Sequence, residues 1–225
     1  MTGQGWAEVM SWYRMHGQHK LPWRESRSPW ATLVAEYLLI RTRVSAVSKV
    51  SSGLLEAFPC PDRIVGDRPR WLDLTTSLGL PSRMRRFVET CEAVIGSHAG
   101  VIPVDRKHLL ELPGVGHYTA AAVRCFAYGL PETLVDSNTI RIANRLSGIQ
   151  VSPSRHRSSV VIDHVAGLYE GVRGLPEENY ALLDIGTTVC KSSVPLCGEC
   201  PLNGTCSFAS GKVYATGDSS GDATE

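Results

Sequence analysis

Residues 111–118 read Glu-Leu-Pro-Gly-Val-Gly-His-Tyr, and an alanine-rich run follows them. Pro113 and Gly114 end a short helix over residues 106–112, because proline has no N–H to donate and glycine tolerates positive φ. Gly116 then opens a second helix with a small, apolar face. The pattern therefore predicts two helices that are joined by a tight glycine hairpin.

Such a hairpin leaves backbone N–H groups unpaired at the start of its second helix, where they can bind one phosphate. Because this contact involves no base, it implies nucleic-acid binding without sequence preference. The alternative is an ordinary pair of packed helices in a helical domain. Asp136 favours the first interpretation, because it begins a third helix over about 137–147 and can face a pocket beside the hairpin. Asp is also a preferred N-cap residue, which is the plainer explanation for it.

The composition limits the kind of partner. The chain has 225 residues, a hydrophobic fraction of 43% and a formal net charge of +1. That length suits one large domain or two small ones. Because the net charge of the protein is so small, its overall electrostatic field would not attract a nucleic acid. A nucleic acid would therefore have to be bound by a local basic face. No apolar run approaches membrane-spanning length and no signal peptide opens the chain, so we expect a cytoplasmic, nucleoid-associated protein without a membrane partner.

Apolar positions at helical spacing predict an all-α fold, and we find no convincing strand. Besides the helices above, we expect helical segments over residues 5–16, 29–43, 44–60, 67–78, 83–97, 155–170 and 176–190. Leu21-Pro22-Trp23-Arg24 leads from the first of these into an extended link. The polar tail over 211–225 is rich in Gly and Ser and is predicted to be disordered.

Glu36 is a single carboxylate inside an apolar run over residues 33–40. Charged side chains are almost never fully buried unless they are paired or used. Glu36 therefore lies either on the one wet stripe of its helix or in an apolar pocket that raises its pKa. A second charged feature is the arginine-rich stretch over 83–86. A solvated face is the commoner explanation for such a run, although contact with a nucleic-acid backbone gains weight beside a phosphate-binding hairpin.

Four of the seven cysteines, Cys190, Cys197, Cys200 and Cys206, are bunched near the C-terminus around a Cys-x-x-Cys core. In a reducing compartment such a cluster indicates metal ligation and not disulfides. Four thiolates can surround one zinc ion or a four-iron, four-sulfur (4Fe-4S) cluster, and the spacing alone does not separate the two.

Four features occur together and in order: Leu21-Pro22-Trp23-Arg24, the hairpin over 112–116, Asp136 and the cysteine spacing. With this combination, the chain resembles the helix-hairpin-helix DNA glycosylases that carry an iron–sulfur cluster. That superfamily includes endonuclease III and the MutY-type adenine glycosylases. The resemblance covers about residues 6–208.

The resemblance implies two α-helical domains with a cleft between them. One is a six-helix barrel over residues 26–135. The other is a discontinuous cluster domain made of residues 1–25 and 136–210. The resemblance also implies that the four cysteines hold a 4Fe-4S cluster in preference to zinc.

The resemblance also assigns the catalytic residues. Asp136 matches the carboxylate that stabilises positive charge on the sugar as the N-glycosidic bond breaks, which requires the base to flip out of the stack. Glu36 matches the pocket glutamate, which bonds the flipped base or holds a water. Tyr118 stands where endonuclease III relatives have the lysine that forms a Schiff base and cuts the strand. A monofunctional glycosylase, which leaves an abasic site, is therefore implied.

Further residues match the family's base pocket or DNA contacts. Asn138 supports Asp136 or a phosphate, Arg41 fills the gap left by flipping, and Leu80 or Pro81 is the wedge. The other matched residues are Thr42, Arg83, Leu112, Gly114, Gly116, His117 and Lys191. Lys191 is the one basic residue between Cys190 and Cys197, a loop that is usually basic in the family.

Comparison with the MutY-type enzymes limits the choice of substrate base. Those enzymes usually read Gln-Gln-Thr and Asp-Gly-Asn-Val where this chain reads Ile-Arg-Thr over 40–42 and Asp-Ser-Asn-Thr over 136–139. The chain also ends soon after the cysteines, without the domain that inspects 8-oxoguanine. These differences favour the Mig-type mismatch enzymes, which remove thymine or uracil opposite guanine from double-stranded DNA, here as a monomer. The alternatives are an adenine glycosylase acting on A·G or A·8-oxoG, and a non-catalytic DNA-binding or redox-sensing relative, against which Asp136 argues.

Overall fold

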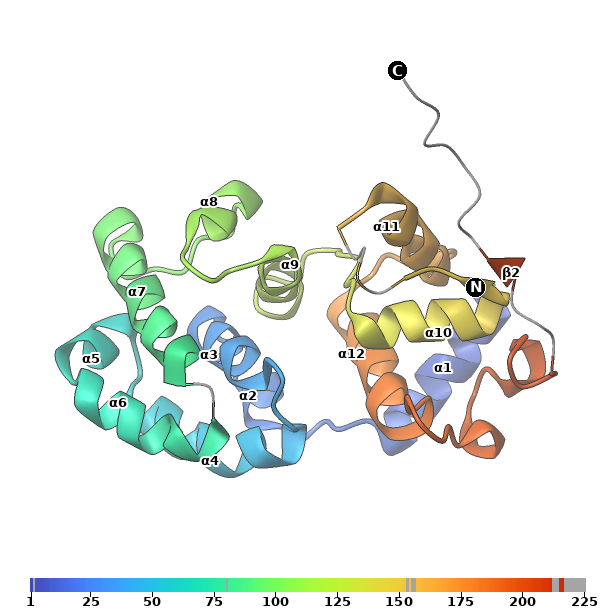
Figure 1. Cartoon of the computed structure of the whole chain (residues 1–225), viewed down its shortest axis with the longest axis horizontal. Coiled ribbons are helices and arrows are strands. Elements are labelled where there is room, and N and C mark those ends of the chain that lie inside the picture. The colour runs from blue at the N-terminus through green and yellow to red at the C-terminus, as the bar shows by residue number, and fades with distance from the viewer. Residues whose placement is uncertain (2, 80, 153, 155–156, 212–214, 217–225) are drawn as a thin grey trace, which may run out of the picture. The chain divides into compact units, whose positions relative to one another are not determined.

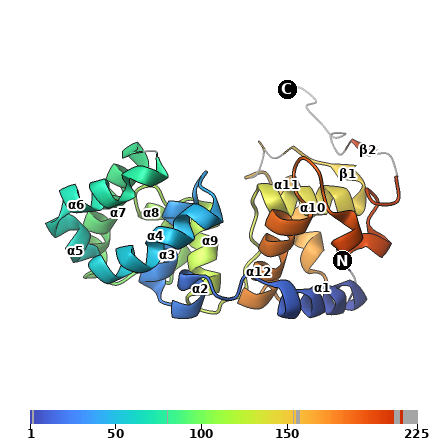
Figure 2. The same cartoon turned by 90° about the horizontal axis from the view of Figure 1, so that it is seen from below.

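The computed structural model describes residues 1, 3–79, 81–152, 154, 157–211 and 215–216. It divides the chain into two compact units, which are described separately. The hairpin unit is His19–Leu130, and the cysteine unit joins Met1–Gln18 to Pro131–Glu225. Both units are built almost wholly of helices (Figures 1 and 2), so the predicted all-α fold is confirmed.

The hairpin unit contains eight α-helices among its described residues. They are α2 (Pro22–Ser26), α3 (Pro29–Leu39), α4 (Val44–Ala57), α5 (Pro61–Gly66), α6 (Arg68–Thr75), α7 (Pro81–His98), α8 (Arg106–Glu111) and α9 (His117–Phe126). Helix α3 packs against α4 and α9, and α7 packs against α5 and α6. The extended link expected over 21–24 is wrong. The short helix α2 begins there at Pro22, whose fixed φ suits a first helical turn.

Helix α3 lies at the centre of the hairpin unit. Its start is set by Ser28, whose hydroxyl accepts a hydrogen bond from Ala31 N at 3.2 Å, and by Pro29 in the first turn. Every residue over 30–38 is buried. A helix that is apolar on nearly all sides is stable only when other elements cover it, which explains its place.

An aromatic cluster forms the core around α3 and α7. The Phe87 ring centroid lies 4.5 Å from that of Tyr37, 5.3 Å from Trp71 and 5.8 Å from Trp30. Burial of one such side chain contributes about 1.5–3 kcal/mol to the free energy of unfolding. The α3 and α7 backbones are therefore firmly tied together.

In the cysteine unit, segments from both ends of the chain lie side by side. Helix α1 (Gly3–His16) packs against α12 (Pro176–Asp184), and α10 (Ser137–Ser147) packs against α11 (Ser159–Ala166) and α12 (Figures 1 and 2). Asp184 fastens the end of the N-terminal segment, because its carboxylate accepts from Gln18 N at 2.8 Å and from Gln18 Nε2 at 3.0 Å.

Two expected helices of the cysteine unit differ from the prediction. Of the helix expected over 155–170, residues 155–156 lie outside the described residues, and the described remainder contains α11 and a 3₁₀ turn at Gly167–Tyr169. The helix over 176–190 changes after α12 into a π-helix, η4 (Ile185–Val189). A pattern of apolar residues does not distinguish these helix types.

Two very short strands correct the expectation of none. Strand β1 (Ile149–Gln150) pairs in parallel with β2 (Ala215–Thr216), with Ile149 opposite Ala215. Strands of two residues are too short to produce an alternating pattern. The tail predicted to be disordered therefore has an ordered pair of residues at 215–216, whereas 212–214 and 217–225 lie outside the described residues.

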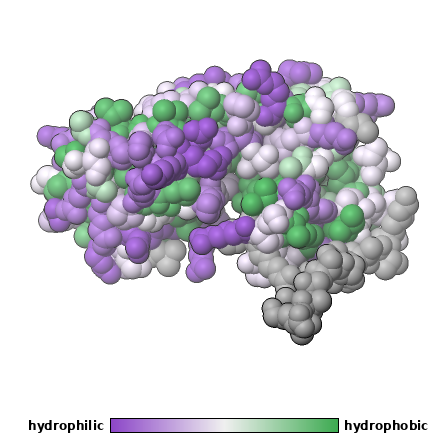
Figure 3. All heavy atoms as spheres, turned by 90° about the horizontal axis from the view of Figure 1, so that it is seen from above, coloured by the Kyte–Doolittle hydropathy of each residue, from purple (hydrophilic) through white to green (hydrophobic). Residues whose placement is uncertain are grey.

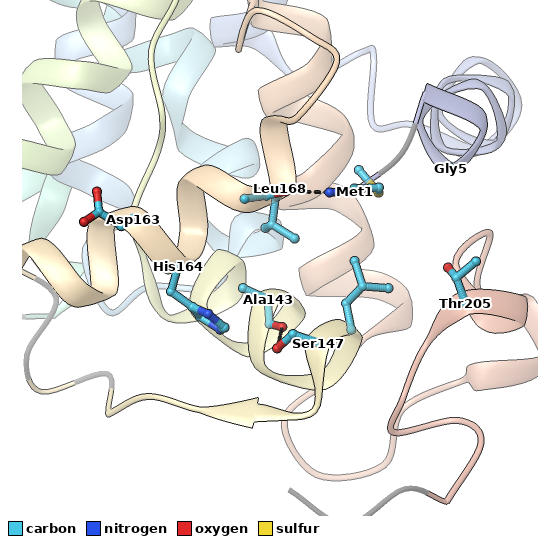
Figure 4. Close-up of a pocket in the computed structure, with 10 residues that line it drawn as sticks. Met1, Gly5, Ala143, Ser147, Asp163, His164, Leu168 and Thr205 are labelled. Atoms are coloured by element: carbon cyan, nitrogen blue, oxygen red, sulfur yellow. Dashed lines mark hydrogen bonds between the residues drawn. The ribbon is translucent and has the colours of Figure 1, made fainter. Parts of the chain in front are cut away.

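A cavity of about 450 Å³ lies in the cysteine unit between α1, α10 and α11 (Figure 4). His164 lines it, and the ring Nε2 is buried without a hydrogen-bond partner among the described residues. Loss of solvent lowers the pKa of His164, which favours the neutral ring. None of the residues that line this cavity is a predicted site residue.

In the described part of the chain, no helix is long and apolar enough to cross a bilayer. Exposed large apolar side chains such as Met15, Val101 and Val194 come from different elements. Figure 3 shows hydrophobic and hydrophilic residues interspersed over one face of the molecule.

Candidate functional site

The Asp136 side chain is the N-cap of α10 and is fixed by three donors. One carboxylate oxygen accepts from Asn138 N at 2.9 Å and from Thr139 N at 2.8 Å, and the other accepts from Asn138 Nδ2 at 2.8 Å. Thr139 completes a capping box, since its hydroxyl accepts from Asp136 N at 3.0 Å. The two interpretations of Asp136 are thus compatible: the residue caps a helix, and capping holds a half-buried carboxylate in one orientation.

Asn138 connects this carboxylate to Arg141, one turn further along α10. The Asn138 amide donates to Asp136, and its oxygen accepts from Arg141 Nη2 at 2.8 Å. Arg141 also donates from Nη2 to Gly186 O at 2.7 Å and from Nε to Cys190 O at 2.7 Å. The guanidinium therefore joins the support of Asp136 to the backbone at the first cysteine of the cluster, a role that the sequence did not predict.

The π-helix η4 brings its backbone close to Asn138. In this turn Cys190 N donates to Ile185 O at 2.6 Å, five residues back. A Cβ atom on Gly186 would lie 2.7 Å from Asn138 Cβ, so only glycine allows this approach. π-Turns inside α-helices are frequent at functional sites. Here the π-turn leaves the Gly186 carbonyl available to Arg141.

The four predicted ligand cysteines line one small cavity of about 20 Å³ in the cysteine unit. All are free thiols, and within the described ranges no three His, Cys, Asp or Glu residues are gathered to bind a single metal ion. Four thiols around one cavity are the donor set of a four-iron, four-sulfur cluster as well as of one zinc ion. The fit to an iron–sulfur cluster therefore rests on this donor set.

The chemistry of the thiols agrees with such a group. Burial, together with the neighbouring Cys190, Cys206 and Cys197, raises the pKa of Cys200 to about 11. Four thiolates so close together need positive charge in their midst.

Arg145 supplies positive charge at the edge of this cavity. Its Nη1 donates to Cys190 Sγ at 3.3 Å and to Lys191 O at 2.7 Å, and its guanidinium lies 4.8 Å from the Phe208 ring centroid. Cys206 Sγ donates to Arg145 O at 3.3 Å. Arg145 thus fixes the loop after Cys190, on which the predicted contact residue Lys191 is exposed.

The glycine hairpin is present in the hairpin unit as predicted. Helix α8 is capped by Asp105, whose carboxylate accepts from Lys107 N at 2.9 Å, and Gly114 takes a positive φ of 76° between the helices. Gly116 is the N-cap of α9 and has no side chain that could accept a hydrogen bond from the first N–H groups of the helix.

Side chains around the hairpin differ in exposure. Leu112 is only 3% exposed, so its side chain is not available to a partner. His117 is exposed, and Arg86, part of the arginine-rich stretch over 83–86, is exposed and lies against Gly114. Arg86 gives the hairpin a neighbouring positive charge.

Glu36 is on a covered face of α3 and is 7% exposed, which rules out the wet-stripe alternative. Thr32 lies one helical turn earlier on the same face, and its hydroxyl is buried without a partner among the described residues. Tyr118 lies half-buried in the first turn of α9, which packs against α3. The structure therefore gathers buried polar groups on α3 and an aromatic side chain on the helix that covers it.

The remaining predicted residues lie where α3 ends and α7 begins. Arg41 is exposed with a positive φ of 53°, and Pro81 is the exposed first residue of α7. Arg83 donates to Thr42 Oγ1 at 3.2 Å, yet its Nε and Nη1 are buried without partners in the described part of the chain. Burial lowers the pKa of Arg83. Leu80 lies outside the described residues.

Three relatives of known activity align with most of the chain, whereas no family model matches it. The thymine-DNA glycosylase of Aeropyrum pernix is 34% identical over 204 residues, 89% of this chain and 92% of the relative. The thymine/uracil-DNA glycosylase of Pyrobaculum aerophilum is 35% identical over 205 residues, 89% of each chain. The adenine DNA glycosylase of Mycolicibacterium smegmatis is 37% identical over 199 residues, 87% of this chain and 67% of the relative.

Solved structures agree with this grouping. A thermostable thymine-DNA glycosylase superposes with a TM-score of 0.80 at 28% identity, covering 91% of this chain and 94% of that one. Endonuclease III in a non-covalent complex with DNA shares the fold, with a TM-score of 0.75 at 24% identity over 94% of this chain and 98% of that one. The chain belongs to the helix-hairpin-helix DNA glycosylases, in the branch that contains the thymine-DNA glycosylases and the MutY-type adenine glycosylases.

Proposed function

We propose that this protein is a monofunctional glycosylase that acts on double-stranded DNA and hydrolyses the N-glycosidic bond of thymine or uracil mispaired with guanine. The observation that carries the proposal is the Asp136 carboxylate, which three donors hold at the start of α10. The named activities of the Aeropyrum and Pyrobaculum relatives support the choice of base.

The reaction needs a fixed negative charge near the sugar. Breaking the N-glycosidic bond moves positive charge onto the sugar ring, and a carboxylate about 4 Å away stabilises it by about 4 kcal/mol at an effective dielectric constant of about 20. That stabilisation corresponds to about three powers of ten in rate. Asp136 supplies the charge, and its hydrogen bonds prevent the carboxylate from turning away.

The base has to leave the stack to react, and the buried polar groups of α3 are suited to receive it. In this proposal Glu36 bonds the flipped base or holds the water that attacks the sugar. Thr32 offers a second polar group on the same helix face. Tyr118 packs on the base or the sugar. Since tyrosine has no amine, it forms no Schiff base, and the product is an intact strand with an abasic site.

The hairpin and its surroundings would bind the DNA backbone. The N–H groups at the start of α9, which no N-cap side chain bonds, suit one phosphate, and Arg86 adds a positive charge near the hairpin. At the end of α3 and the start of α7, Arg41 and Pro81 are exposed, and Arg83 is incompletely hydrogen-bonded among the described residues. In this proposal, these residues supply the wedge that separates the base pair and the side chain that fills the gap left by the flipped base.

We also propose that Cys190, Cys197, Cys200 and Cys206 hold a 4Fe-4S cluster. Their common cavity and the mutual repulsion of their thiolates support this assignment. When bound, such a group ties the C-terminal loops together and can exchange an electron. The protein's own residues, Arg141 and Arg145, connect that region to α10.

An adenine glycosylase is the second candidate. Its support is the 37% identity to the adenine DNA glycosylase of Mycolicibacterium smegmatis, which is as high as the identity to the thymine enzymes. The buried Glu36 suits a purine as well as a pyrimidine, because a carboxyl group can accept from or donate to either base.

One panel of labelled duplexes separates the two functions. The purified protein is incubated with T·G, U·G, A·G and A·8-oxoG duplexes and with a matched T·A duplex, and each product is divided into two portions. We expect breaks at T·G and U·G only, and only in the portion heated in alkali. Breaks at A·G and A·8-oxoG alone would favour the adenine enzyme. Breaks in no duplex would contradict both.

A further inference from the structure

The carbonyl oxygen of Pro113, in the middle of the hairpin, is bonded by two buried hydroxyl groups. Tyr37 on α3 donates to it, and Thr90 on α7 lies 2.6 Å away. The two hydroxyls also lie 2.7 Å from each other. Tyr37 is 1% exposed and Thr90 is fully buried, so neither hydroxyl exchanges its partner for water.

The turn at Gly114 packs directly against the Tyr37 hydroxyl group. A Cβ atom on Gly114 would overlap the Tyr37 hydroxyl and would lie 3.2 Å from Arg86 Cδ. The hairpin thus needs glycine at this position for two reasons, the positive φ of 76° and the close approach of Tyr37. Burial raises the pKa of Tyr37 to about 12, so the phenol keeps the proton that it donates.

The two supporting helices are themselves rigid. Tyr37 stacks within the aromatic core, 4.5 Å from the Phe87 ring centroid, and Thr90 follows Phe87 by one turn on α7. A peptide carbonyl held at this point also fixes the peptide units that follow it. Those units carry the N–H groups at the start of α9.

We propose that Tyr37 and Thr90 are positioning residues that hold the 112–116 hairpin in its DNA-binding conformation. This inference rests on the proposed function, in which the hairpin binds a phosphate. A preorganised loop binds more tightly because it loses less conformational freedom on binding. The two hydroxyls therefore act on the affinity for DNA backbone and not on the bond-breaking step, in which the hairpin does not take part.

The test uses variants that remove only a hydroxyl group. Tyr37→Phe and Thr90→Val remove the two bonds to Pro113, and Thr90→Ser keeps the hydroxyl. Tyr128→Phe and Thr75→Val are matched controls in the same unit, because Tyr128 donates to Ile102 O and Thr75 donates to Trp71 O at 2.8 Å, away from the hairpin. All five substitutions cost some stability, and thermal unfolding records how much.

Three quantities are measured for each variant: the Kd for a T·G duplex and for a fully paired duplex, the salt dependence of that Kd, and the single-turnover excision rate at saturating DNA. For Tyr37→Phe and Thr90→Val we expect a Kd about tenfold higher for both duplexes and a rate within about twofold of wild type. The slope of log Kd against log salt should stay close to that of wild type, because no Lys or Arg contact to a phosphate is removed. Thr90→Ser and both controls should bind like wild type.

Other outcomes would overturn the inference. It is wrong if Tyr37→Phe and Thr90→Val bind DNA like the controls, if Thr90→Ser is as weak as Thr90→Val, or if the rate falls while the Kd is unchanged. A wild-type protein that binds no duplex DNA would overturn the proposed function and this inference together. A wild-type protein that binds DNA but excises no base would overturn only the proposed function, since binding to the paired duplex still tests the hairpin.

Discussion

Asp136 shows how one residue serves a helix and a reaction at once. Its N-cap geometry is a common local structure, and the sequence contains what that geometry requires: Asp followed by Thr three residues later. What the sequence does not contain is the third donor, the Asn138 amide, whose orientation depends on Arg141. Two of the three donors to the carboxylate are therefore predictable from local sequence, whereas the third is held by Arg141, which is itself bonded to Gly186 and Cys190 outside α10.

Asp136→Asn tests the need for charge. Asparagine is also a good N-cap, so α10 should still begin at this residue. The substitution removes the negative charge and places an NH₂ group opposite the Asn138 amide. We expect the single-turnover excision rate to fall by about three powers of ten, with the Kd for DNA within a few-fold of wild type. An unchanged rate would show that another group stabilises the sugar.

Tyr118→Lys tests the monofunctional assignment. Wild type should leave the strand uncut until alkali is added, because tyrosine has no amine. A lysine that is half-buried in the first turn of α9 would have a lowered pKa, through burial and the nearby arginines, and would be a better nucleophile. We expect the variant to nick the strand and to be trapped on DNA by borohydride, although slowly. If wild type itself nicks and traps, another amine reaches the sugar and the assignment is wrong.

At the scale of elements, the π-helix η4 is the feature that sequence patterns missed. Thr187 and Thr188 bond back to Leu183 O at 2.9 Å and to Asp184 O at 2.7 Å, and Gly186 has no side chain to pack. Side-chain bonds of this kind compete with the regular helical ladder. Apolar spacing continues unchanged through this turn, so periodicity predicts an ordinary helix up to residue 190.

Arg141 joins two elements, and Arg141→Lys tests that connection. The guanidinium bonds Asn138, Gly186 and Cys190 together, which one ammonium group cannot do. We expect the excision rate to fall about 10- to 100-fold, the usual effect of removing a group that supports a ligand or a catalytic residue. Arg124→Lys is the control, because Arg124 also donates to a backbone carbonyl, Val104 O at 2.7 Å, but lies in the other unit. Equal rates in the two variants would show that Asp136 does not depend on this connection.

At the scale of the whole molecule, the sequence predicted features made by neighbouring residues and missed contacts between residues that are far apart in the chain. The hairpin, the Asp136 cap and the cysteine spacing are each contained in a few consecutive residues. The Tyr37 bond to Pro113 spans 76 residues and the Arg141 bond to Cys190 spans 49. A pattern in a single sequence does not show that residues so far apart are in contact, because their contact depends on how whole helices pack. Glu36 shows the same limit, since only packing decided between its two interpretations.

The metal content is a property of the whole protein, and it tests the assignment of the four cysteines. The four thiols line a common cavity and must lose their protons to bind a metal, so bound metal should add to the stability of the cysteine unit. We expect the purified protein to be brown and to contain about four irons per chain. Cys197→Ser should lose most of that iron and unfold at a lower temperature. Cys60→Ser should keep it, because Cys60 lies in the hairpin unit at the start of α5, where serine is a good N-cap. Colourless wild-type protein with one zinc per chain would contradict the assignment. It would also mean that the four sulfurs close around one ion, and the loop that Arg145 and Arg141 fasten to α10 would then have to move toward the cavity.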